Sequence, residues 1–191
     1  MSARPQAQDW TGMIDQSARL LQEQTGLGLS EWNERVRDSD ITDEGNLEAW
    51  LVDRGITGYP LMILVMERFG YPDFMLASAD DLIDGQYRDR PHLRPILDTV
   101  IEVATSVGDV TVQARKGYVS LVTPRRTFSM VRASTRQRVD LGLKLPGAQP
   151  VGRLLTAKGL PHGNVRIALT DPAEVDDEVV RLLERSYAAN C

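Results

Sequence analysis

The sequence predicts an α+β protein: an all-helical N-terminal module, then an antiparallel sheet of four or five strands with helices on one face. Up to about residue 76, apolar residues recur at the three-to-four-residue spacing of amphipathic helices. After Gly108 the spacing changes to two, which is the period of a half-buried strand. Only short turn-forming stretches separate the first four of these strands, and such short connections favour an antiparallel meander.

Length and composition are those of an ordinary globular protein. The chain has 191 residues, of which 42% are apolar and 26% charged, so it can bury a core without disulfides or metals. The longest apolar run, residues 61–66, has six residues, whereas a membrane span needs roughly 20. With no apolar stretch at its start and one cysteine, Cys191, the chain is expected to be cytoplasmic, with no membrane association, metal or cofactor.

Four helices are predicted in the N-terminal module. The first carries Trp10, Ile14, Ala18 and Leu21 on one face and ends at Gly26. The other three are recognised by capping residues and by glycines beyond their ends. These are Ser30 for the second, Thr42 and Gly55 for the third, and Thr57 and Gly70 for the fourth. Because residues 61–66 are apolar on all sides, the fourth helix is expected at the centre of the module.

A short helix beginning at Ser78, a polar linker and a longer helix from Pro91 to Gly108 precede the strands. Five strands are then predicted, over residues 110–115, 118–122, 127–131, 138–145 and 165–169. A short helix is predicted near residues 153–158, and a final helix follows the strong start signal of Asp171 and Pro172. The predicted domains are therefore a helical module at 1–77, a linker with a short helix at 78–90 and an α+β domain at 91–191.

Several stretches resemble an uncharacterised two-part bacterial family. Its first part is a small helical module of unknown function; its second is a domain of unknown function also found at the C-terminus of proteins labelled predicted transport proteins. The stretches that carry the resemblance are 24–26, 30–32, 94–97, 110–112, 115–121, Phe128, 139–143 and 165–187. The resemblance implies the same architecture and brings no activity, cofactor or catalytic residue with it.

Charge is unevenly distributed along the chain. Residues 1–111 contain 9 basic and 20 acidic side chains, and residues 169–191 contain 2 and 6. Residues 112–168 contain 11 basic side chains and only one acid, Asp140. A net charge of -5 for the whole chain thus conceals a strongly basic segment that coincides with the predicted strands.

Strand parity places much of this positive charge on one face of the sheet. If alternate residues such as Val112, Leu141 and Ile167 point to the core, the bases between them lie on the opposite face, beside Tyr118 and Ser120. Guanidinium groups beside a phenol are suited to bind phosphate or carboxylate. The candidate anion-binding residues are Arg115, Lys116, Tyr118, Arg125, Arg126, Arg138, Lys144, His162 and Arg166.

Three interpretations of the basic face stay open. In the first, the face is solvated, as one side of an antiparallel sheet commonly is. In the second, the acidic helical module docks on it, within the chain or between subunits. In the third, it binds an external anion such as nucleic acid or a phosphorylated metabolite. The single aromatic residue on the face argues against single-stranded nucleic acid, whose bases usually stack on several rings.

No arrangement of nucleophile and base stands out in the sequence. His92 lies at a helix start, and His162 lies in a loop without a neighbouring carboxylate. Trp10, Trp32 and Trp50 either anchor the helical core or line a cleft that stacks a flat ligand. The sequence therefore favours a non-catalytic binding protein with an anionic partner and identifies no catalytic residue. The alternatives are a small-molecule binding protein with its site between the helical module and the sheet, and, third, a small enzyme.

Overall fold

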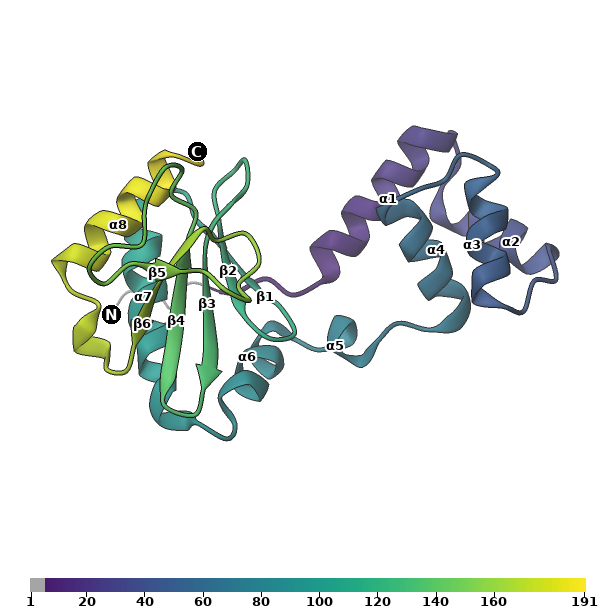
Figure 1. Cartoon of the computed structure of the whole chain (residues 1–191). Coiled ribbons are helices and arrows are strands. Elements are labelled where there is room, and N and C mark those ends of the chain that lie inside the picture. Colours follow the sequence, from purple (N-terminus) through teal and green to yellow (C-terminus); the bar gives the residue numbers. More distant parts are fainter. Residues whose placement is uncertain (1–5) are drawn as a thin grey trace. The chain divides into compact units, whose positions relative to one another are not determined.

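The computed structural model describes residues 6–191 and confirms the predicted α+β class, with helices in the N-terminal part followed by an antiparallel sheet (Figure 1). The described chain divides into two compact units, residues 10–76 and residues 6–9 together with 77–191. No helix of the described chain has both the length and the apolar character needed to cross a membrane.

The helical unit is organised around its fourth helix. Its helices are α1 (Thr11–Thr25), α2 (Leu29–Asp38), α3 (Glu44–Val52), α4 (Tyr59–Phe69) and the single turn α5 (Asp73–Leu76). α4 packs against α1, α2 and α3, and its Ile63, Leu64 and Val65 are buried. The prediction that this apolar helix lies at the centre of the module is confirmed.

The α+β unit contains a six-stranded antiparallel sheet with the order β1-β2-β3-β4-β6-β5. Its strands are β1 (Thr111–Ala114), β2 (Val119–Val122), β3 (Thr127–Thr135), β4 (Arg138–Leu143), β5 (Leu155–Thr156) and β6 (Val165–Leu169). Its helices are α6 (Ala79–Tyr87), α7 (Arg94–Val107) and α8 (Asp177–Ala188), with short 3₁₀ turns at η1 (Pro91–Leu93) and η2 (Pro172–Glu174).

The edge strand β5 lies in a stretch that was predicted to be helical. The short helix predicted near residues 153–158 is wrong: Leu155 and Thr156 pair with Arg166 and Val165 of β6 instead. Gly152 and Gly159, both with positive φ, turn the chain on either side of this two-residue strand. So short a strand carries no detectable alternation, which is why its pattern could not reveal it.

One face of the sheet forms the core of the unit with α7 and α8 (Figure 1). The strand residues predicted to point inward are all buried: Val112, Val119, Leu121, Val139, Leu141, Leu143, Val165 and Ile167. Apolar residues of the two helices such as Leu97 and Leu183 are also buried. Parity therefore located the core face of the sheet correctly.

Residues on both sides of the helical unit in sequence belong to the α+β unit. The Gln8 amide donates to the Val112 carbonyl at 2.8 Å, and the Ala114 amide donates to the Gln8 carbonyl at 2.8 Å. These bonds add Gln8 to the free edge of β1 as a parallel bridge. On the other side, α6 packs against β1. The helical unit is thus inserted, in sequence, between two segments of the α+β unit.

Candidate functional site

The structure distributes the nine predicted anion-binding residues over several places in the α+β unit. Arg115, Lys116 and Tyr118 lie in and beside the β1–β2 turn, and Arg125 and Arg126 lie in the β2–β3 turn. Arg138 begins β4, Lys144 follows its end, Arg166 lies in β6, and His162 lies in the loop before β6. The side chains of Arg138 and Arg166 meet at the carboxylate of Asp140.

Asp140 is a buried carboxylate that contacts two arginines. Arg166 Nη1 donates to Asp140 Oδ1 at 2.7 Å, while Arg138 places its Nε 3.0 Å from Oδ1 and donates from Nη2 to Oδ2 at 3.3 Å. The side chain of Asp140 is 5% exposed, against 18% for Arg166 and 36% for Arg138. A single acid thus orders two partly exposed guanidinium groups on the face of the sheet opposite α7 and α8.

Arg132 is a third arginine of this site. It lies directly opposite Asp140 in the register of β3 and β4, so both side chains share a face of the sheet. Arg132 is exposed, and its Nη1 donates to the Gly159 carbonyl at 2.9 Å. The predicted third strand ended at residue 131, whereas β3 continues to Thr135. Had it been extended, alternation with the buried Val131 would have placed Arg132 beside Asp140. Below, "the arginine cluster" means Arg132, Arg138 and Arg166 around Asp140.

The middle of this face is covered by the chain itself. Ser120 and Met130 are buried, and so is Leu160 of the β4–β6 connection. A Cβ added to Gly142 would lie 2.9 Å from Met130 Cγ and 3.2 Å from Leu160 Cδ1, so the glycine leaves room for both side chains. The long connection returns across the sheet (Figure 1) and covers apolar surface that local alternation alone assigns to solvent.

Arg125 and Arg126 contact the C-terminal end of α8. Arg125 Nη1 donates to the Cys191 carbonyl at 2.8 Å and Arg126 Nη2 donates to the Ala189 carbonyl at 3.1 Å. These carbonyls have no partner further along a helix, and cations at this end also offset the helix dipole. Part of the basic character of the segment therefore stabilises the protein's own last helix.

Two further predicted residues, Arg115 and His162, lie directly after β1 and in the loop before β6. Arg115 donates to the side chain of Gln113 and, at 3.3 Å, to the Ala114 carbonyl. The carbonyl of Arg115 in turn accepts from the Gln86 side chain of α6 at 2.8 Å. His162 is exposed and has a positive φ of 66°. Across residues 6–191, no group of three or more His, Cys, Asp and Glu side chains is placed to hold a metal ion.

A family model described as a domain of unknown function (DUF5655) matches residues 83–190, which is more than half of the chain. The chain belongs to the DUF5655 family. The DUF5655 region begins within α6 and contains the whole sheet, α7 and α8, so it includes the arginine cluster. No curated protein and no solved structure matches the chain.

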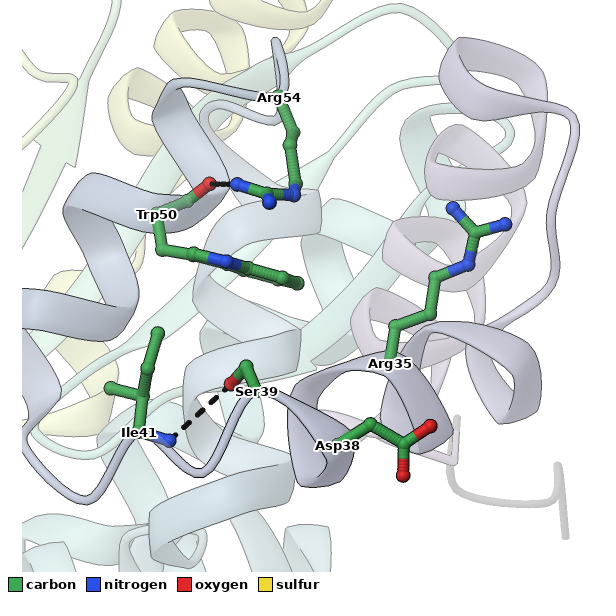
Figure 2. A pocket seen from close by; sticks show the side chains of 6 residues that line it. All are labelled: Arg35, Asp38, Ser39, Ile41, Trp50 and Arg54. Carbon is green, nitrogen blue, oxygen red and sulfur yellow. Dashed lines mark hydrogen bonds between the residues drawn. The ribbon is translucent and has the colours of Figure 1, made fainter.

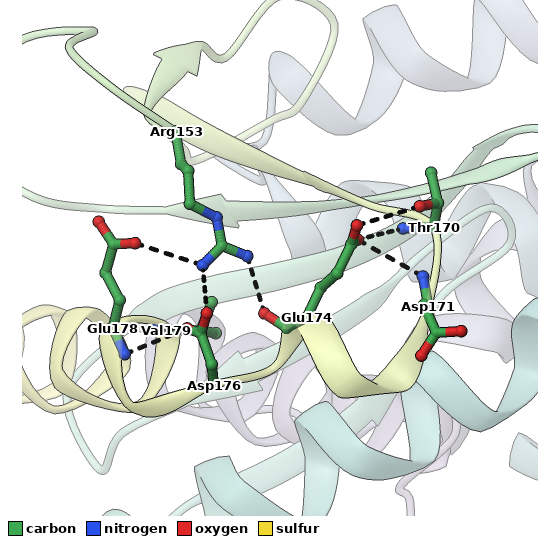
Figure 3. A network of polar contacts seen from close by, with 7 residues as sticks. All are labelled: Arg153, Thr170, Asp171, Glu174, Asp176, Glu178 and Val179. Atoms are coloured by element: carbon green, nitrogen blue, oxygen red, sulfur yellow. Dashed lines mark hydrogen bonds and ion pairs between the residues drawn. The ribbon is translucent and has the colours of Figure 1, made fainter.

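A second polar network in the DUF5655 region holds the β4–β6 connection to the start of α8 (Figure 3). Arg153 Nη1 lies 2.7 Å from Asp176 Oδ2 and 3.3 Å from Glu178 Oε2, and its Nη2 donates to the Glu174 carbonyl at 2.8 Å. Asp176 also caps α8, accepting from the amides of Glu178 and Val179. The Val179 amide and the Arg153 guanidinium lower the pKa of the Asp176 carboxyl below its ordinary value.

This network predicts a pH-dependent effect of replacing Arg153. A carboxyl whose pKa is lowered by folding stabilises the protein above its unfolded pKa, and that stability is lost as the pH falls through the folded pKa. We expect Arg153→Met to lower the midpoint of urea unfolding at about pH 7. The effect should be smaller at about pH 3, which is below the ordinary pKa of an aspartate, because the unfolded chain then binds the proton that folding must displace from Asp176. Arg181→Met, an exposed change in α8, is the control. An equal loss for Arg153→Met at both pH values would contradict the ion-pair explanation.

A groove lies outside the DUF5655 match, in the helical unit (Figure 2). Its volume is about 510 Å³, and its lining residues are Arg35, Asp38, Ser39, Ile41, Trp50 and Arg54, from α2, α3 and the turns that follow them. The sequence allowed its tryptophans either to anchor the helical core or to line a cleft. Trp32 is buried in the core, whereas Trp50 is half-buried and lines this groove.

Proposed function

We propose that the protein is a non-catalytic binding protein and that the arginine cluster takes phosphate or carboxylate groups of an anionic partner. The observation that carries the proposal is the sharing of one buried carboxylate, that of Asp140, between Arg138 and Arg166. Arg132 lies opposite the same carboxylate in the sheet register. Three guanidinium groups against one acid leave an excess of two positive charges at one place.

Hydrogen-bonding capacity supports the same proposal. Each guanidinium has five N–H donors in a planar fork. Asp140 accepts hydrogen bonds from Nη2 of Arg138 and Nη1 of Arg166, and the Gly159 carbonyl accepts one from Nη1 of Arg132. Arg138 Nε lies 3.0 Å from Asp140 Oδ1 but is buried without a hydrogen-bond partner. The remaining donors include pairs with the geometry that binds phosphate and carboxylate oxygens in a bidentate manner.

Asp140 also prepares the site for a ligand. Free arginine side chains lose rotamer entropy when they bind, which weakens association by about 0.5–1.5 kcal/mol for each side chain that becomes ordered. Arg138 and Arg166 are already held by the carboxylate, so less entropy remains to be lost. Their partial burial lowers the local dielectric and strengthens their attraction for an anion.

The proposal predicts salt-sensitive binding of anions that depends on the cluster. We expect the full chain to bind labelled RNA, DNA or heparin at low salt, with affinity that falls steeply as salt is added. Arg132→Ser, which leaves both ion pairs of Asp140 intact, should weaken binding about tenfold, the low end for a charged hydrogen bond. Arg181→Ser on α8 is the matched control and should bind as the unchanged chain does. Fluorescence anisotropy at two salt concentrations measures all of these affinities.

The test has outcomes that contradict the proposal. An absence of binding to every polyanion and to phosphorylated metabolites at low salt would exclude an external anion. If, in that case, Arg132→Ser lowered the stability of the chain by more than the lost hydrogen bond to the Gly159 carbonyl explains, about 1.5–3 kcal/mol, the acidic helical unit would be the better occupant of the cluster, within the chain or between copies. That unit carries 5 arginines and 12 carboxylates in residues 10–76. Unchanged stability would instead indicate a solvated basic face.

We also infer that the chain has the two-part organisation of the bacterial family that it resembles and that it is cytoplasmic. Stretches 24–26 and 30–32 support residues 10–76 as the small helical module that precedes such domains in bacteria. The order of stretches from 94 to 187 supports the type of DUF5655 domain also found at the end of predicted transport proteins. One cysteine in the chain supports a reducing, cytoplasmic compartment.

A further inference from the structure

We propose that the groove of the helical unit binds a nucleoside monophosphate. The inference is independent of the proposed function, because none of its residues belongs to the arginine cluster or to the DUF5655 match. The groove combines three groups: Arg54 on the ring of Trp50, Arg35 on the facing wall and the carboxylate of Asp38 at the rim (Figure 2). These are complementary to the base, the phosphate and the ribose hydroxyls of such a ligand.

The first part of the groove is a platform of tryptophan and arginine. The guanidinium carbon of Arg54 lies 3.7 Å from the centroid of the Trp50 ring, and its Nη1 donates to the Trp50 carbonyl at 2.9 Å. The two contacts hold the guanidinium flat on the indole (Figure 2), and Arg54 itself is exposed. The outer face of a fixed guanidinium plane is a surface on which nucleobases stack.

The second part is Arg35, on the opposite wall. Its guanidinium carbon lies 5.3 Å from the centroid of the Trp32 ring, and Trp32 contacts Trp50 edge-to-face with 6.4 Å between centroids. Each tryptophan of this pair thus carries one arginine on its ring. Within the described part of the chain, neither Arg35 nor Arg54 has an ion-pair partner, so Arg35 can offer all of its donors to a phosphate.

The third part is Asp38, whose exposed carboxylate lies at the rim. A carboxylate accepts hydrogen bonds from the ribose diol or from the exocyclic amine of a base. A simple inorganic anion has neither of these donor groups. The volume of about 510 Å³ lies within the range of about 300–1,000 Å³ for small-ligand sites. The excess of carboxylates over arginines in residues 10–76 repels long polyanions and so favours a small ligand over a nucleic acid.

Titration of the full chain with AMP, GMP, CMP and UMP tests the proposal. Calorimetry gives the affinity, and tryptophan fluorescence reports on the ring that lines the groove. We expect at least one nucleotide to bind at submillimolar concentration. Two compounds that each lack one part of the nucleotide are the controls: the matching nucleoside lacks the phosphate, and ribose 5-phosphate lacks the base. If AMP is the ligand, adenosine and ribose 5-phosphate should each bind at least about tenfold more weakly than AMP. If another nucleotide binds, its own nucleoside replaces adenosine.

Variants then locate the bound nucleotide. Arg35→Leu and Arg54→Leu should each weaken binding about tenfold, and circular dichroism should show unchanged helix content because both side chains are exposed. Arg37→Leu, an exposed change in the same helix α2, is the matched control. Arg132→Ser should leave nucleotide binding unchanged, which separates this site from the arginine cluster. The proposal is overturned if no nucleotide binds at millimolar concentration or if ribose 5-phosphate binds as tightly as the nucleotides. It is also overturned if adding Arg35→Leu and Arg54→Leu to the Arg132→Ser variant, in which the arginine cluster is weakened, leaves nucleotide binding unchanged.

Discussion

Replacing Asp140 by alanine is expected to lower the free energy of unfolding by about 3 kcal/mol, because it leaves Arg138 and Arg166 partly buried without their carboxylate. The value is the low end for breaking a buried ion pair, since Arg138 is more than a third exposed and water screens its charge. Urea unfolding followed by circular dichroism measures this loss. Glu184→Ala, an exposed change in α8, is the control and should stay within about 0.5 kcal/mol of the unchanged chain.

The same variant separates stability from binding. Removing Asp140 takes away one negative charge and frees guanidinium donors, and we expect this gain to exceed the lost ordering of Arg138 and Arg166. The affinity for polyanions should therefore increase while the stability falls. Replacing Asp140 and Arg166 together by apolar residues should restore part of the stability, because the more buried of the two arginines is then no longer left without its carboxylate. A loss below about 0.5 kcal/mol for Asp140→Ala would show that Asp140 does not hold the cluster as described.

The parts of the fold that depend on local periodicity could be predicted from the sequence. Alternation in β4 and β6 identified the core face of the sheet, and the unbroken apolar run of α4 identified the centre of the helical unit. What could not be predicted depends on the path of the chain. The burial of Ser120 and Met130 follows from a long connection that places Leu160 over the sheet, and no nearby residue encodes that path.

The candidate sites divide in the same way. Arg138 and Arg166 were expected on one face because parity places them there, whereas the partners of Arg125 and Arg126 are carbonyls more than 60 residues away in sequence. In the groove, the spacing of Trp50 and Arg54 by four residues is a signal that the sequence did contain, because residues four apart are neighbours on a helix and Arg54 lies in the turn directly after α3. The approach of Arg35 from α2 depends on how the helices pack and had no such signal.

Removing α6 is expected to destabilise the α+β unit severely, which makes the position of the domain boundary testable. Leu82, Ile83 and Tyr87 of α6 are buried, and the Gln86 side chain donates to the Arg115 carbonyl at 2.8 Å. The sequence predicted a linker up to residue 90 and a domain that folds from there onward, and this boundary stays a prediction. The packing of α6 against β1 leads us to expect that the unit needs this helix.

We therefore expect residues 77–191 alone to give a dispersed amide spectrum and residues 91–191 alone to be largely unfolded. Each large buried side chain that is lost costs roughly 2–5 kcal/mol, so losing three approaches the entire stability of a typical domain, about 5–15 kcal/mol. Residues 77–191 also lose the bridge of Gln8 to β1, but its two hydrogen bonds lie at a sheet edge where water can replace them. Tyr87→Ala within residues 77–191 is the graded control and should lie between the two. A dispersed spectrum for residues 91–191 would instead place the boundary after α6, and a collapsed spectrum for residues 77–191 would mean that the α+β unit requires the helical unit to fold.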